Sequence, residues 1–182
     1  MKWIGILTMV LGMGIYMAVY FLIKKYKIKG SVSATAFSWK RKSGEVWSLP
    51  FTLLCIFLGL GYGIAMLNNM QNHISFAGIF ALLGAFGLLT TGVAWDYKST
   101  KQGLTMHMVG SMGGIVAAVV AGGLATGQWW LVIAMGLFWF ISYGFKLPIF
   151  GKVIPLGIKY KNTTFWVEQG ALVACCIFLA IL

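Results

Sequence analysis

The chain has 182 residues, of which 60% are hydrophobic and only 9% are charged, and its mean hydropathy is +0.89. Soluble domains carry charge on about a quarter of their residues and cannot hide so much apolar surface from water, so this composition excludes a soluble globular domain and indicates a membrane protein. The formal net charge of +11 would suggest nucleic-acid binding in a soluble domain, but here the charges lie between apolar runs, where they act as topology signals, and no nucleic-acid partner is expected.

Six apolar segments have about the length, roughly 17 to 25 residues, that a helix needs to cross a bilayer. A polar turn, TGQ, followed by Trp129 and Trp130 separates the fourth segment from the fifth. The sequence therefore predicts an all-α fold, with residues 1–182 forming a single transmembrane domain, a polytopic bundle of six helices. In chain order the helices are expected at residues 3–23, 51–67, 74–95, 105–125, 129–145 and 164–182.

The distribution of lysine and arginine predicts the orientation of these helices. Thirteen of the fourteen basic residues fall in the loops that follow the first, third and fifth segments, and basic loops are retained on the cytoplasmic side. We therefore expect a multi-pass protein of a bacterial inner membrane with both termini on the outer side. Anionic lipid headgroups are the expected partners on the cytoplasmic side, contacted by Lys40, Arg41, Lys42, Lys159 and Lys161.

The fourth segment is rich in small residues. Glycine and alanine recur every four residues along two adjacent rows of this helix, and such rows allow helix backbones to approach closely in lipid. We expect this helix to lie at the centre of the bundle. Its packing is expected from Gly110, Gly113, Gly114, Ala117, Ala118, Ala121 and Gly122.

Three ionisable residues are expected at the cytoplasmic boundary of the membrane. His107 lies three residues before Gly110, on the close-packed face of the fourth segment. Asp96 ends the third segment, and a short loop brings it towards His107. Glu168 lies one turn inside the sixth segment, where a charge is costly unless it is paired, protonated or beside water. Each residue also has a purely structural explanation: a core histidine, an interfacial ion pair and a helix-start carboxylate.

The remaining reactive side chains are hydroxyls and thiols. In the loop after the first segment, Ser33 and Thr35 are candidates either for ligand binding or for capping a short interfacial helix. The three cysteines lie inside apolar segments and show no CxxC or Cys/His ligand spacing. We therefore read them as small buried hydrophobes and expect neither a metal nor a cofactor.

Three short motifs carry a resemblance to a family. SVSAT at 31–35, a histidine that opens the fourth helix after a lysine-containing loop, and FWVE at 165–168 together resemble an uncharacterised family of small polytopic membrane proteins from Bacteroidetes and related bacteria. The resemblance implies a six-helix architecture and names no activity. The chain departs from the family's tyrosine pair after the SxSAT segment, where it has Ala36 and Phe37. The residues that the resemblance marks are Ser31, Ser33, Ala34, Thr35, His107, Trp166 and Glu168.

The leading functional hypothesis is a non-enzymatic membrane protein with a cytoplasm-facing polar pocket that binds or transports a small polar ligand or a lipid headgroup. Glu168 is the proton-responsive group of this pocket and His107 is its hydrogen-bond partner, with Asp96 and Ser33 completing the wall. A second hypothesis is a structural or assembly subunit whose glycine and alanine rows pack against a second copy or a partner. A third is a membrane-embedded lipid hydrolase or transferase, although Asp96, His107 and Glu168 barely supply the three ligands that a zinc site needs.

Overall fold

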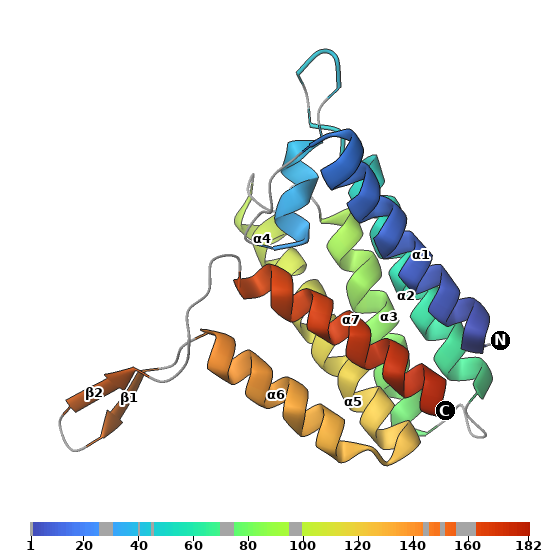
Figure 1. Cartoon of the computed structure of the whole chain (residues 1–182), viewed down its shortest axis with the longest axis vertical. Helices are drawn as coiled ribbons and strands as arrows, with labels where there is room; N and C mark the ends of the chain where they lie inside the picture. Colours follow the sequence, from blue (N-terminus) through green and yellow to red (C-terminus); the bar gives the residue numbers. More distant parts are fainter. Residues whose placement is uncertain are drawn as a thin grey trace.

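The computed structural model describes residues 2–25, 31–39, 41–44, 46–69, 75–94, 100–143, 146–149, 152–155 and 163–182. Within these ranges the chain is helical apart from one short hairpin (Figure 1). The elements are α1 (Lys2–Ala18), the π-helical turn η1 (Val19–Ile23), the 3-10 helix η2 (Ser33–Ser38), α2 (Leu49–Asn69), α3 (Phe76–Val93), α4 (Lys101–Met108), the π-helical turn η3 (Val109–Gly113), α5 (Gly114–Thr126), α6 (Trp129–Tyr143), β1 (Lys146–Ile149), β2 (Lys152–Pro155) and α7 (Thr163–Ile181).

Several helices are long and apolar enough to cross a membrane. Within the described ranges there are five such candidates, Trp3–Leu22, Leu49–Asn68, Phe76–Val93, Lys101–Thr126 and Thr163–Ile181, and each falls on a predicted segment. The helix on the remaining predicted segment, α6, is apolar but has only 15 residues, which at 1.5 Å per residue gives it a length of about 22 Å. These helices are compatible with a multi-pass membrane protein.

The outer surface of the bundle is apolar. Leu22, Phe76 and Val93 are 75%, 76% and 72% exposed, and they are accompanied by many other large hydrophobic side chains. Contiguous apolar surface of this extent is unfavourable in water and favourable against lipid chains. The surface therefore agrees with the composition in indicating lipid as the solvent of the helices.

The helix contacts do not single out the small-residue helix as the centre of the bundle. α1 packs against α2, α2 against α3, and α3 against α5, whereas α7 contacts α1, α2, α5 and α6. The small-residue helix α5 contacts α3, α6 and α7, and the most buried candidate span is Leu49–Asn68 rather than the span that contains α5, so the expectation that α5 is the central helix is not confirmed. The N- and C-termini lie at one end of the bundle, and η2 and the first residues of α4 and α7 lie at the other end (Figure 1). We call this second end the η2 end.

α3 and α5 meet at a backbone-to-backbone contact between glycines. A Cβ atom added to Gly87 would lie 2.5 Å from the Cα atom of Gly114 and 2.7 Å from the carbonyl oxygen of Gly110. Only the absence of a side chain permits this approach. A Cβ atom on Gly113, by contrast, meets nothing within 4 Å, so this member of the expected packing set faces away from the bundle.

The other small residues of the two rows are already packed inside the chain. Ala117, Ala118, Ala121 and Gly122 are buried, and a Cβ atom on Gly122 would lie 2.3 Å from the ring of Phe178 on α7. These side chains are therefore covered by α3 and α7 of the same molecule. Association with a second copy or a partner would need a different face of α5.

The loop after α6 contains the hairpin, which is the one described departure from the all-α expectation. β1 pairs with β2 in antiparallel register, with Lys146 opposite Pro155 and Pro148 opposite Val153. Proline has no N–H donor, so each of these strands is suited to a small edge pair rather than to a larger sheet.

Candidate functional site

The segment that contains η2 is fixed to α1 by a chain of buried hydrogen bonds. The indole N–H of Trp39 donates to the Tyr16 hydroxyl at 3.0 Å, and the Tyr16 hydroxyl lies 2.5 Å from Thr35 Oγ1. Thr35 Oγ1 in turn donates to the carbonyl oxygen of Val32, so the Tyr16 hydroxyl must be the donor to Thr35. Consecutive bonds of this kind polarise and strengthen one another in a low-dielectric interior.

Loss of the Tyr16 hydroxyl should destabilise the protein. In Tyr16→Phe the buried Trp39 N–H loses its acceptor and the Thr35 hydroxyl loses its donor, so we expect the free energy of unfolding to fall by about 1–3 kcal/mol. Unfolding in detergent can be followed by the reaction of a thiol dye with the buried, free Cys55 and Cys175. Thr105→Val, which removes an exposed hydroxyl bonded within its own helix, should shift stability by less than about 0.5 kcal/mol. Equal stability of the two variants would contradict the importance of the network.

Glu168 joins α7 to the same segment. Its Oε2 atom accepts the backbone N–H of Val32 at 2.5 Å, and Val32 immediately precedes η2. The residue is half-buried and lies about 8 Å along α7 from Thr163. Among the residues that the structure describes, the other carboxylate oxygen has no hydrogen-bond partner. The expected bond between Glu168 and His107 is therefore not formed, because the carboxylate is directed to a backbone N–H instead.

His107 joins α4 to the end of α3. It is only 2% exposed, and its Nδ1 atom lies 3.2 Å from the carbonyl oxygen of Ala94, which caps α3. A carbonyl oxygen can only accept, so Nδ1 carries the proton and donates. This contact matches the structural explanation of His107 as a core histidine bonded to a neighbouring helix.

A polar outer pocket lies where η2, η3 and α7 meet. Its volume is about 380 Å³, and Ser31, Ser33, His107, Ser111, Trp139 and Glu168 are among its lining residues. Three of the residues nominated from the sequence, Ser33, His107 and Glu168, thus line one pocket. Ser111 belongs to the π-helical turn η3, a type of irregularity that recurs at functional sites.

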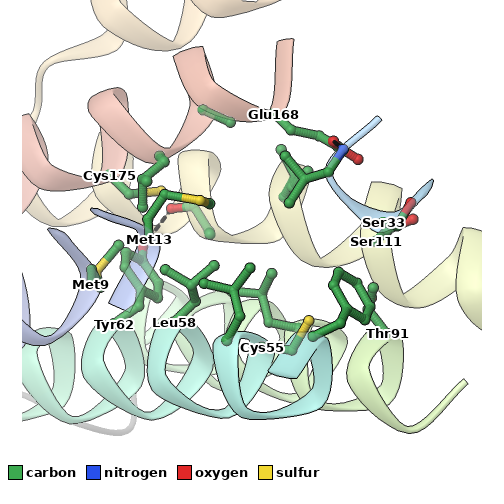
Figure 2. A pocket seen from close by; sticks show the side chains of 18 residues that line it. Met9, Met13, Ser33, Cys55, Leu58, Tyr62, Thr91, Ser111, Glu168 and Cys175 are labelled. Atoms are coloured by element: carbon green, nitrogen blue, oxygen red, sulfur yellow. Dashed lines mark hydrogen bonds between the residues drawn. The ribbon is translucent and has the colours of Figure 1, made fainter. Parts of the chain in front are cut away.

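An apolar inner cavity adjoins the outer pocket on the side of the bundle interior. Its volume is about 80 Å³, and it shares Ser33, Ser111 and Glu168 with the outer pocket. Figure 2 shows these three residues at one end of the cavity and Met9 and Tyr62 at the other. The Tyr62 hydroxyl is satisfied by the carbonyl oxygen of Ala118 at 2.5 Å, so the far end offers mainly carbon and sulfur surface. The two spaces together form a site that is polar at the η2 end and apolar within the bundle.

No protein-family model, curated protein or solved structure matches this chain. Its function is therefore inferred from these residues and their geometry.

Other residues nominated from the sequence lie apart from this site. Thr35 is fully buried and bonded to Tyr16 and Val32, and it does not line either space. Two of the basic residues expected at lipid headgroups, Arg41 and Lys42, are exposed just after η2. The nominated residues that fall outside the described residues are Asp96, Lys40, Lys159 and Lys161.

The geometry gives no support to the hydrolase hypothesis. In a Ser–His–acid triad the carboxylate orients the histidine, whereas here Glu168 bonds Val32 and His107 bonds Ala94. Within the described part of the chain, no three His, Cys, Asp or Glu residues lie close enough together to hold a metal ion.

Sequence reasoning missed three contributors to the site. Ser111 follows His107 by four residues, and this helical spacing could have identified it. Trp139 lies in the middle of the α6 segment, away from the membrane interfaces where tryptophan is usually found, and this position is the signal that it packs against protein. Val32 contributes a backbone N–H, and no side-chain pattern reveals such a contribution.

Proposed function

We propose that the chain is a membrane protein that binds or transports a small amphiphilic ligand, with the polar head of the ligand in the outer pocket and its apolar tail in the inner cavity. The observation that carries this proposal is that the two spaces adjoin and share Ser33, Ser111 and Glu168 in their walls. The outer space has more polar side chains among its lining residues than the inner one, which is the order expected for an amphiphile whose head points outward.

The volumes limit the size of such a ligand. Small-molecule sites occupy about 300–1,000 Å³, and the outer pocket, at about 380 Å³, falls in this range. The inner cavity, at about 80 Å³, is much smaller. The proposed ligand therefore has a compact polar head and a short apolar tail, and long-chain lipids fit only if their chains leave the site sideways between helices.

The proposal includes a six-helix topology in a bacterial inner membrane. α4, η3 and α5 together form one proposed transmembrane segment, which gives six segments with α1, α2, α3, α6 and α7. An even number of crossings agrees with both termini lying at one end of the bundle (Figure 1). α6 covers about 22 Å of a hydrocarbon core of about 30 Å, so local bilayer thinning must accompany it. The basic residues favour a cytoplasmic η2 end, with Arg41 and Lys42 near anionic headgroups. The pocket then faces the cytoplasm and the termini face outwards.

The Ser111→Leu variant tests this proposal. Leucine at Ser111, which lines both spaces, removes a hydroxyl and fills part of each space, whereas leucine at Gly113, two residues away, has free space. Native mass spectrometry of the detergent-extracted protein should show a discrete bound mass in the wild type and in Gly113→Leu, and not in Ser111→Leu. Retention of the same mass by Ser111→Leu, or the absence of any bound mass from the wild type, would contradict the proposed site.

A further inference from the structure

We infer that the ligand head is an ammonium group and that Glu168 is its counter-ion. This inference rests on the proposed function and specifies the chemical class of the ligand. It follows from the charges and hydrogen-bonding groups that line the outer pocket.

Glu168 leaves half of its bonding capacity for a ligand. One carboxylate oxygen accepts the N–H of Val32, and the other has no hydrogen-bond partner among the described residues. Burying the charge of a carboxylate within a membrane helix costs free energy unless a cation or further hydrogen-bond donors pair with its oxygens. An ammonium group supplies both the charge and the donors.

The rest of the pocket wall favours a cation over an anion. Among the described residues, the lining of the outer pocket includes no lysine or arginine, and its titratable members there are Glu168 and His107. The Nδ1 proton of His107 is engaged by Ala94. A phosphate or carboxylate head would therefore meet the charge of Glu168 without a cationic partner in the described part of the lining. A bound ammonium can donate to the hydroxyls of Ser33 and Ser111, which accept as readily as they donate.

Trp139 provides a second feature suited to a cation. Its side chain lines the same outer pocket as Glu168, and indole is the aromatic ring that attracts cations most strongly. A site with one carboxylate and one indole distinguishes an ammonium from a hydroxyl of equal size, because a neutral head gains neither interaction in full.

The inner cavity sets the length of the tail. Its volume of about 80 Å³ is several times the roughly 10–15 Å³ that one water molecule needs in a cavity, which is room for a short hydrocarbon chain. A chain of about four carbon atoms is therefore a suitable probe. Butylammonium, 1-butanol and butanoate have the same tail and differ only in the head.

Binding of these three probes to the purified protein in detergent, measured by ligand-observed NMR titration, tests the inference. Charge-assisted hydrogen bonds are stronger than neutral ones, so wild-type protein should bind butylammonium at least about tenfold more tightly than 1-butanol, and butanoate most weakly. In Glu168→Gln, whose amide oxygen still accepts the Val32 N–H, this preference should fall to within about twofold. Gln169→Leu is the matched control, because Gln169 is the next residue along α7 and lines the groove between α1 and α7 instead of the pocket.

The outcomes separate this inference from the proposed function. Equal binding of butylammonium and 1-butanol, abolished by Ser111→Leu, would overturn the ammonium head and leave the amphiphile site standing. Binding of all three probes that Ser111→Leu does not change would overturn the site itself. An undiminished preference in Glu168→Gln would overturn the role of Glu168. If Glu168→Gln does not fold, the order of the probes in the wild type decides the head group, and Trp139→Leu should lower the affinity for butylammonium more than that for 1-butanol.

Discussion

Replacement of Gly87 by leucine should be the most damaging single change in the helical bundle. The Cβ atom alone would lie 2.5 Å from the backbone of Gly114, and a backbone atom cannot rotate away as a flexible side chain can. α3 and α5 must then separate, and both lose the close packing that holds helices together in lipid. Because overpacking of a well-packed interior costs about 1–3 kcal/mol even where side chains can adjust, we expect a loss of stability above about 3 kcal/mol.

Gly113→Leu is the matched control for this prediction. It introduces the same side chain on a neighbouring turn, at a position where an added Cβ atom meets nothing within 4 Å. The thiol dye should therefore react with Cys55 and Cys175 at a much lower temperature in Gly87→Leu than in the wild type, and at a similar temperature in Gly113→Leu. Similar melting of the two variants would show that the contact between α3 and α5 is not close in solution.

Two substitutions of Glu168 should have different effects on stability. Glu168→Ala removes the acceptor of the Val32 N–H, and Val32 is only 6% exposed. An unsatisfied buried donor costs about 1–3 kcal/mol, and a hydrogen bond between α7 and the segment that opens η2 is lost with it. Glu168→Gln keeps an oxygen in the same place, so its loss of stability should be less than half as large.

Proteolysis provides a second measurement for these variants. Because the carboxylate holds the start of η2 against α7, limited cleavage after Arg41 or Lys42, which are exposed just beyond η2, should be faster in Glu168→Ala than in Glu168→Gln. Equal cleavage and equal melting of the two variants would show that the bond to the Val32 N–H does not hold η2 against α7.

The depth of each polar residue could be predicted from the sequence, but its partners could not. Ser33, His107 and Glu168 were expected at one membrane boundary because His107 and Glu168 lie at the start of their apolar segments and Ser33 lies in the basic loop after the first segment, and the structure brings them to one pocket. The hydrogen bonds were not predictable: Glu168 bonds Val32 and His107 bonds Ala94, rather than one another. Both partners are backbone groups, which every residue carries, so the sequence does not distinguish them.

The face of α5 that packs against other helices was equally hard to predict. Gly113 and Gly114 are adjacent in the sequence and belong to two equally plausible rows of small residues, yet only Gly114 meets another helix. The sequence of α5 has small residues on more than one face, so its pattern leaves the choice of face open. The hydrophobic pattern of the neighbouring helices does not resolve this choice either, because in lipid both buried and outward faces are apolar.

The amino-acid sequence by itself determined the class of protein, the positions of the helices along the chain and the end at which polar groups gather. These properties follow from hydropathy and segment length, which act residue by residue against the solvent. Only the tertiary structure decided that α7 contacts four other helices, that Tyr16 and Trp39 hold η2, and that the outer pocket adjoins an apolar cavity. Those features depend on which side chains fill the space between helices, and packing of this kind is a property of several segments together rather than of any one of them.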